Sequence, residues 1–317
     1  MKNKTTLLAL ALALGFAAPV VPVLAEDTPN YIEEMKRWQP QAEAGDAEAQ
    51  FQLGQMYALG HGFKQNYKSA LEWYEKAAAQ GNAKARTALG MLYYYGVGVE
   101  KNEEKAGEWF EKAAVQDDIL AQFHMGLIAY NARDNTMAKQ WWERAAAKDY
   151  APAMKNIGQL YKNGEGVAQD SAKAKYWYEK GAKQKKYSAS SMYMLAQLYL
   201  DGNGVKKDKE QAIAWLKKSC TLDEPESIHA CHKIYNNYFD EELEPVLSQQ
   251  KIFTHAMKAA KNGSPEGALI LRQLKDTEFI FPDADKEQAL AFADKFNDDE
   301  YWNRRLVELS LEALQDE

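Results

Sequence analysis

Proline and cysteine are both scarce in this sequence, and the two shortages set the first limits on its fold. The chain has 317 residues but only nine prolines, so long stretches can form uninterrupted helices. Its two cysteines allow at most one disulfide within the chain. Hydrophobic residues still make up 46% of the sequence, which is enough to build a packed core. These features favour a mostly helical protein.

Catalytic signatures are also missing. The sequence has no Gly-x-Ser-x-Gly elbow, no His-Glu-x-x-His motif and no glycine-rich phosphate loop, and its five histidines are scattered. One short match occurs, because Ser248-Gln249-Gln250-Lys251 fits the Ser-x-x-Lys pattern of penicillin-recognising enzymes. The companion Ser-Asp-Asn and Lys-Thr-Gly motifs are absent, so we interpret this match as a coincidence. The sequence predicts no enzyme activity and no cofactor.

A long apolar run is found only at the start of the chain. Met1-Lys2-Asn3-Lys4 is short and positive, residues 7–16 are apolar, and residues 23–25 suit a cleavage site after Ala25. This is the pattern of a secretory signal peptide, and the run is too short for a comfortable membrane span. We therefore expect residues 1–25 to be removed and the mature protein to be periplasmic or secreted.

Negative charge dominates the remainder of the chain. The net charge is −7, and removal of Lys2 and Lys4 with the signal peptide would make it −9. A negative surface argues against nucleic acid and anionic membranes as partners, and it leaves basic proteins possible. No later stretch is apolar for long enough to span a bilayer. We expect a protein partner, no nucleic acid and no membrane insertion after cleavage.

A short frame recurs along the chain and indicates internal repeats. It is clearest in residues 49–57, where Gly54 is followed three residues later by Tyr57. The position of Gly54 recurs in steps of 32–39 residues at Gly90, Gly126, Gly158, Ala196, Tyr235 and Arg272. A nearly fixed period in this range is typical of stacked supersecondary units.

Each unit is predicted to be a pair of helices joined by a glycine turn. The first helix carries small or apolar residues on one face, as at Ala49, Leu53 and Met56. A turn such as Gly60-His61-Gly62 follows, because glycine permits the positive φ that ends a helix. The second helix, over residues 70–78 in the first unit, should pack its alanines and aromatic residues against the first.

These features resemble the Sel-one-like repeat family, a relative of the tetratricopeptide repeats. The matching frame comprises the Leu-Gly-x-x-Tyr helix, the Gly-x-Gly turn and the Ala-x-x-Trp-Tyr-x-Lys-Ala-Ala helix. The resemblance implies an all-α fold, namely an α/α solenoid of about seven helix-turn-helix repeats of roughly 36 residues. It also implies a protein that binds other proteins.

The export signal and the resemblance together divide the chain into four expected parts. Residues 1–25 are the signal peptide, residues 26–46 contain an N-terminal capping helix, and residues 47–220 hold five clear repeats. Residues 221–317 are expected to contain degenerate repeats and a C-terminal capping helix over residues 301–315, because terminal repeats cap a solenoid. The third repeat lacks the glycine turn and has residues 130–134 in its place.

The two cysteines fall on neighbouring helices of this frame. Outside the cytoplasm, Cys220 and Cys231 should form a disulfide. Their placement resembles that in the Helicobacter cysteine-rich proteins, a secreted branch of the same family, although the loop between them is longer here. His229 and His232 lie beside Cys231, but the spacing is not that of a standard zinc site, so we expect no metal.

One face of the first helices is a candidate binding surface. It lies about 180° from the core face and carries aromatic residues that could supply contact area for a partner. Alternatively, these side chains pack between tightly spaced helices. We call this set the concave stripe; it comprises Phe51, Gln55, Met91, Tyr94, Phe123, Leu127, Tyr130, Lys155, Gln159, Tyr193 and Gln197.

Four functions remain open on this evidence. The favoured one is a non-catalytic scaffold or adaptor of the bacterial periplasm that binds a partner on the concave stripe. A second is an immunity protein that neutralises a secreted toxin, for example one delivered by type VI secretion. A third is a secreted host-interaction factor. The fourth, a secreted β-lactam or cell-wall hydrolase, is weakened by the missing motifs.

Overall fold

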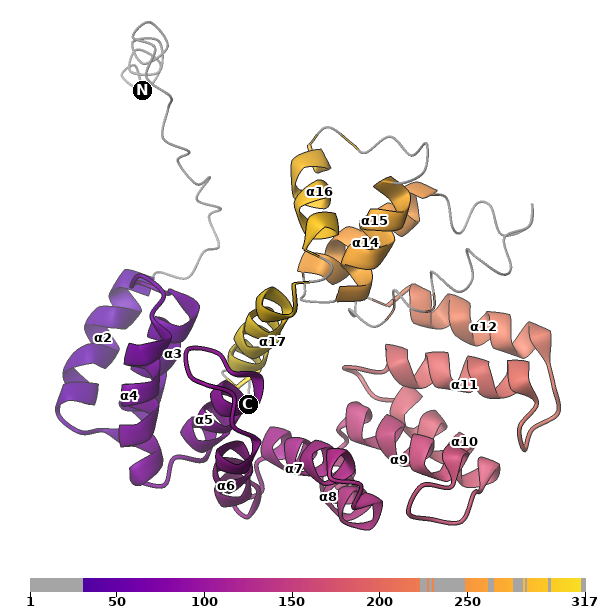
Figure 1. The fold of residues 1–317 in the computed structure, drawn as a ribbon, viewed down its shortest axis with the longest axis horizontal. Coiled ribbons are helices and arrows are strands. Elements are labelled where there is room, and N and C mark those ends of the chain that lie inside the picture. Colours follow the sequence, from indigo (N-terminus) through magenta and orange to yellow (C-terminus); the bar gives the residue numbers. More distant parts are fainter. Residues whose placement is uncertain are drawn as a thin grey trace, which may run out of the picture.

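A computed structural model describes residues 31–222, 249–261, 265–275, 284–295 and 298–314, together with residues 227, 230 and 282. All regular secondary structure in these residues is α-helical, and consecutive helices pack as pairs (Figure 1). The all-α solenoid predicted from the sequence is therefore confirmed. Tyr235, one position of the repeat frame, and Cys231 lie outside the described residues.

Five helical hairpins follow the opening helix α2 (Tyr31–Glu43). Their first helices are α3 (Ala47–Leu59), α5 (Ala83–Tyr95), α7 (Ile119–Asn131), α9 (Ala151–Asn163) and α11 (Ala189–Asp201). Their second helices are α4 (Tyr67–Ala79), α6 (Glu103–Ala114), α8 (Asn135–Ala147), α10 (Ser171–Ala182) and α12 (Lys209–Cys220). The C-terminal part contains α14 (Gln249–Lys261), α15 (Pro265–Lys275), α16 (Lys286–Asp294) and α17 (Asp299–Ala313).

Local sequence signals explain where these helices begin and end. Eight of the ten hairpin helices start after an Asp or Asn whose side chain accepts a backbone N–H, as Asp46 does from Ala49 at 2.7 Å. The first helix of four hairpins ends at a left-handed glycine such as Gly60, with φ at 77°. In the third hairpin, which lacks that glycine, Arg133 takes the left-handed conformation instead.

A glycine on the first helix packs against an aromatic ring on the second in each of the first four hairpins. A Cβ atom added at Gly54 would lie 2.6 Å from the Tyr74 ring, and Gly90, Gly126 and Gly158 face aromatic rings in the same way. The fifth hairpin has Ala196 at this position, and its second helix presents the smaller Leu216 in the same core cluster. The smaller side chain makes room for the alanine methyl group.

This compensation can be tested in the fourth hairpin. Gly158→Ala should lower the free energy of unfolding by about 1–3 kcal/mol, because the new methyl group overlaps the Tyr178 ring. Adding Tyr178→Leu, which reproduces the pair of the fifth hairpin, should give a smaller total loss than the sum of the two single changes. Urea denaturation of the parent protein, the two single variants and the double variant measures these losses in free energy of unfolding. Strictly additive losses would contradict the described packing.

Contacts between repeats curve the stack so that the first helices line its inner side. α5 contacts α7, and α9 contacts α11, although a second helix separates each pair in sequence. Polar contacts between successive first helices and turns tie neighbouring hairpins together. Asn131 donates to the Tyr94 hydroxyl at 3.2 Å, Tyr130 donates to Glu165 at 2.9 Å, and Lys162 pairs with Asp201 at 3.4 Å.

A buried histidine lies between the second and third hairpins. The ring of His124 stacks on Phe110 with centroids 4.8 Å apart and meets Tyr94 and Phe123 edge-on. Burial lowers the pKa of His124 to about 4 from an ordinary value of 6.5. The folded protein therefore holds a neutral imidazole near neutral pH.

This histidine should make the protein sensitive to acid. The unfolded chain takes up a proton near pH 6.5, whereas the folded chain does so only near pH 4. The stability contributed by neutral His124 is therefore fully present above pH 6.5 and falls by about 3 kcal/mol as the pH drops to about 4. Urea midpoints at pH 7 and pH 4 should differ less for His124→Phe than for the parent protein. Equal pH dependence of the two would contradict this assignment.

Candidate functional site

The C-terminal helix covers the concave stripe of the first two repeats. α17 contacts α3 and α5, and Figure 1 shows it on the inner side of the curved stack. Val307, Leu311 and Leu314 are fully buried in the same cluster as Phe51 and Met91. Their spacing of four and three residues places them on one side of the helix. The far end of the chain therefore fills the inner surface near its beginning.

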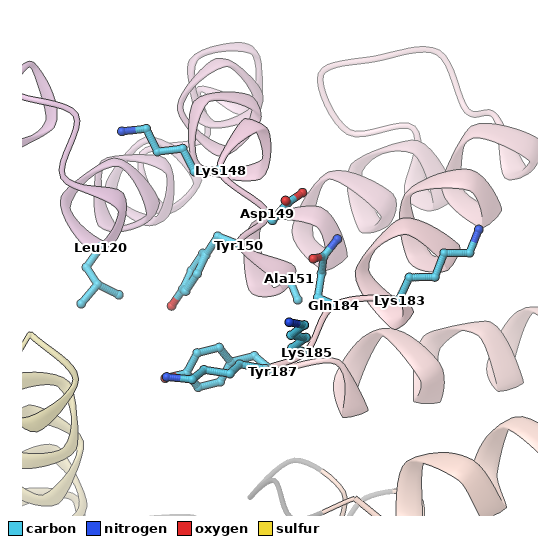
Figure 2. A pocket seen from close by; sticks show the side chains of 10 residues that line it. Leu120, Lys148, Asp149, Tyr150, Ala151, Lys183, Gln184, Lys185 and Tyr187 are labelled. Carbon is cyan, nitrogen blue, oxygen red and sulfur yellow. The ribbon is translucent and has the colours of Figure 1, made fainter. Parts of the chain in front are cut away.

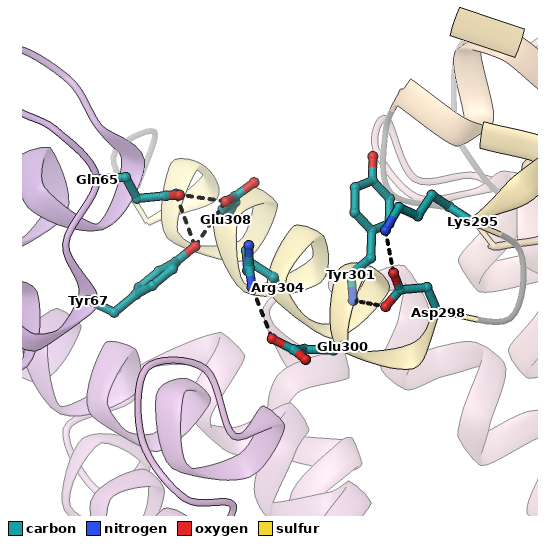
Figure 3. Close-up of polar contacts among 8 residues, drawn as sticks. All are labelled: Gln65, Tyr67, Lys295, Asp298, Glu300, Tyr301, Arg304 and Glu308. Atoms are coloured by element: carbon teal, nitrogen blue, oxygen red, sulfur yellow. Dashed lines mark hydrogen bonds and ion pairs between the residues drawn. The ribbon is translucent and has the colours of Figure 1, made fainter. Parts of the chain in front are cut away.

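Polar side chains hold this helix end in place. Gln55 donates to the Leu311 carbonyl at 2.7 Å, and Lys84 donates to the Leu314 carbonyl at 2.9 Å. Carbonyls in the last turn of a helix have no partner within the helix, so these donors act as a cap supplied by the first helices. The Glu308 carboxylate accepts from Gln65 at 2.8 Å and from Tyr67 at 2.9 Å (Figure 3).

The other end of α17 is anchored in the C-terminal helices. Trp302 donates its indole N–H to the Lys295 carbonyl at 2.8 Å, and its ring stacks on Phe292. Asp298 begins the helix, because its carboxylate accepts the Tyr301 amide at 2.9 Å and pairs with the Lys295 ammonium group (Figure 3). These contacts hold the pKa of Asp298 below its ordinary value. One helix thus ties the last repeats to the first.

The stripe is consequently not open along its whole length. Phe51, Gln55 and Met91 are all 0% exposed. Here the structure differs from the open surface expected from the sequence, because α17 takes the place that a partner would occupy. The helix expected over residues 301–315 does form, but its second half lies on the first two repeats. Its apolar spacing was visible in the sequence, whereas its destination was not.

The stripe is accessible along the third to fifth repeats. Tyr130 is 39% exposed, and its hydrogen bond to Glu165 raises the pKa of the tyrosine hydroxyl. The other stripe residues from Tyr94 onward are half-buried; these are Tyr94, Phe123, Leu127, Lys155, Gln159, Tyr193 and Gln197. Several of these side chains pack partly between helices, which agrees with the alternative interpretation that they fill the space between tightly spaced helices. Each retains a surface that a partner could contact.

The remaining candidate residues are only partly within the described structure. Cys220 is buried at the end of α12, but Cys231 lies outside the described residues, so their disulfide stays a prediction. The signal peptide, His229, His232 and Ser248 also lie outside them. Within the described part of the chain, no group of three or more His, Cys, Asp and Glu side chains could hold a metal ion. No described helix is long and apolar enough to cross a membrane.

Comparison with known families agrees with this architecture. The family model of the Sel1 repeat matches residues 47–82, 83–118, 119–150, 151–186 and 189–224, which together make up more than half of the chain. The chain belongs to the Sel1 repeat family. Proteins of this family commonly mediate protein–protein interactions. A search of curated proteins gives no match.

Two solved Sel1-type structures are similar to this one. A Sel1 repeat protein from Oxalobacter formigenes has 28% sequence identity and a TM-score of 0.59, and the match covers 73% of this chain and 99% of that one. A protective antigen of uropathogenic Escherichia coli with an SLR fold has 26% identity and a TM-score of 0.57. That match covers 86% of this chain but only 58% of the antigen. This Sel1 repeat protein therefore spans little more than half the length of the antigen.

The anchoring of α17 predicts a strong effect of one substitution. Leu311→Asp would place an unpaired carboxylate among Phe51, Met91 and Val307, so the free energy of unfolding should fall by about 3 kcal/mol or more. Thermal unfolding followed by circular dichroism measures the loss. Arg304→Ala on the exposed side of α17 is the control and should change stability by less than about 1 kcal/mol. A Leu311→Asp protein as stable as this control would contradict the described packing.

Proposed function

We propose that this Sel1 repeat protein is a non-catalytic scaffold that acts outside the cytoplasm and holds a protein partner on the inner surface of its third to fifth repeats. The observation that carries the proposal is the division of the concave stripe. Its first part is filled by a helix of the same chain, and its second part is accessible. A surface of this kind suits a helical or extended segment of another protein.

The chemistry of the accessible part supports a protein partner. Tyr130, Phe123 and Leu127 offer aromatic and apolar contact area, while Lys155 and Gln159 offer polar groups at the next repeat. Interfaces combine apolar anchors with polar surroundings in this way. Neighbouring α17 provides an example of the same face receiving an amphipathic helix through buried apolar residues and side-chain donors.

A capture experiment with matched variants tests this proposal. The protein is immobilised and exposed to periplasmic and secreted fractions, and captured proteins are identified by mass spectrometry. Tyr130→Ser with Gln159→Ala should reduce capture of a stoichiometric partner about tenfold or more, because aromatic anchors dominate interface energies. Met137→Ser with Tyr176→Ser removes two exposed apolar residues from second helices and should leave capture unchanged. Equal capture by both variants would contradict the proposed surface.

The identity of the captured protein separates the remaining roles. A secreted toxin would assign the scaffold to immunity, the alternative raised by the sequence, whereas recovery of the scaffold itself in the culture medium rather than in the periplasm would favour host interaction. Hydrolysis of a chromogenic cephalosporin that Ser248→Ala abolishes would contradict the non-catalytic role. Recovery of the protein in the cytoplasm with residues 1–25 still attached would contradict the proposed location.

A further inference from the structure

A cavity of about 560 Å³ lies between the turns that join the third, fourth and fifth repeats. Its lining comes from Leu120 at the start of α7, from the turn between α8 and α9, and from residues 183–187 between α10 and α11. Figure 2 shows Tyr150 and Tyr187 pointing to the same side, toward Leu120. A volume of this size suits a small ligand or a few residues of a peptide.

Positive charge is concentrated around this cavity in an otherwise acidic chain. Four lysines line it, against one acidic residue, although the net charge of the chain is −7. Lys148 donates to the Asp117 carbonyl at 2.6 Å. The other three, Lys183, Lys185 and Lys186, are exposed and form no ion pair with any described residue. Like charges gathered in this way repel one another, and a bound anion would relieve the repulsion.

Aromatic rings connect the cavity to the concave stripe. Tyr150 meets Tyr187 edge-on with ring centroids 5.9 Å apart, and it meets Phe123 of the stripe at 5.2 Å. The three rings form a continuous series from the third repeat to the fifth. A ligand lying along the accessible stripe would therefore reach the lysines without leaving the protein surface.

The backbone of the turn before α11 does not explain why a tyrosine occupies position 187. Tyr187 directly precedes Ser188, the N-cap residue of α11. Its φ is 60°, a left-handed conformation that is uncommon for a large side chain. The same place before a first helix is held with positive φ by Gly45 and Gly81 in the first two turns and by Asp117 and Asp149 in the next two. The turn therefore requires a positive φ at this place but does not require a tyrosine.

We infer that this cavity binds an acidic peptide segment of the partner, with carboxylates at Lys183, Lys185 and Lys186 and an apolar side chain against Tyr150 and Tyr187. This inference rests on the proposed scaffold function and names the chemistry of the partner. A peptide is favoured over an isolated small anion because the cavity has an aromatic wall and continues into the stripe. Lysines suit such a segment, since their flexible ammonium groups can follow carboxylates at different spacings. The partner thus carries an acidic segment even though the scaffold itself is acidic.

Fluorescence anisotropy with synthetic peptides tests the inference. The probe is a fluorescein-labelled peptide that alternates glutamate with phenylalanine and leucine, and its counterpart has lysine in place of every glutamate. The acidic peptide should bind, and its affinity should fall as the salt concentration rises. The triple variant Lys183→Ala/Lys185→Ala/Lys186→Ala should bind it at least tenfold more weakly than the parent protein does.

A second triple variant controls for the change in net charge. Lys64→Ala/Lys206→Ala/Lys207→Ala removes the same charge from turns at the opposite ends of the helices, and it should bind the acidic peptide within about twofold of the parent protein. Tyr187→Asn should weaken peptide binding severalfold without lowering the melting temperature, because asparagine accepts the left-handed backbone more readily. Equal binding by both triple variants, or equal binding of the lysine peptide, would overturn the inference.

Further measurements distinguish a failure of this inference from a failure of the proposed scaffold function. Inorganic phosphate that displaces the acidic peptide at equal concentration would mean a site for small anions only, and it would overturn the peptide assignment. If partner capture requires Tyr130 but survives loss of the three lysines, this inference fails and the scaffold function stands. If partner capture requires neither Tyr130 nor the three lysines, the proposed function fails as well. Loss of capture in both the stripe variant and the cavity variant is the expected result.

Discussion

The close contact between a glycine and an aromatic ring inside each of the first four hairpins is the interaction on which the rest of the structure depends. It brings the two helices together at Gly54, Gly90, Gly126 and Gly158, and the fifth hairpin preserves the fit by pairing Ala196 with Leu216. Because hairpins of one shape stack with one repeated geometry, the first helices align on the inner side and contact one another. The concave stripe and the cavity between the turns follow from that alignment.

The C-terminal helix turns this curved stack into a nearly closed one. Its two ends are anchored in different cores, at Trp302 beside α16 and at Leu311 beside α3 and α5. Closure fixes the distance between the first and last repeats and fills part of the inner surface. It thereby leaves a defined stretch, the third to fifth repeats, as the accessible part of the stripe. The acidic chain presents Lys183, Lys185 and Lys186 beside this same stretch, so the accessible surface and the local positive charge coincide.

Local signals made much of the fold predictable from the sequence. The glycine frame, the left-handed turns and the Asp or Asn caps depend on residues a few positions apart, so the hairpins and the identity of the inner face could be anticipated. The position of α17 could not, because it depends on contacts such as Gln55 to Leu311, which are 256 residues apart in the chain. No short sequence pattern predicts a contact between residues so far apart. The cavity escaped prediction for the same reason, since the start of α7 and two separate turns supply its lining.

The most direct test of this account is site-specific photo-crosslinking in living cells, with benzoylphenylalanine placed at Tyr130 in one strain and at Glu308 in another. The probe at Tyr130, on the accessible stripe, should attach to a partner protein. The probe at Glu308 should instead attach within the same chain, to the segment that contains Gln65 and Tyr67. Partner adducts at Glu308 together with none at Tyr130 would mean that α17 leaves the inner surface and that the partner binds where the helix lies, which would contradict the account.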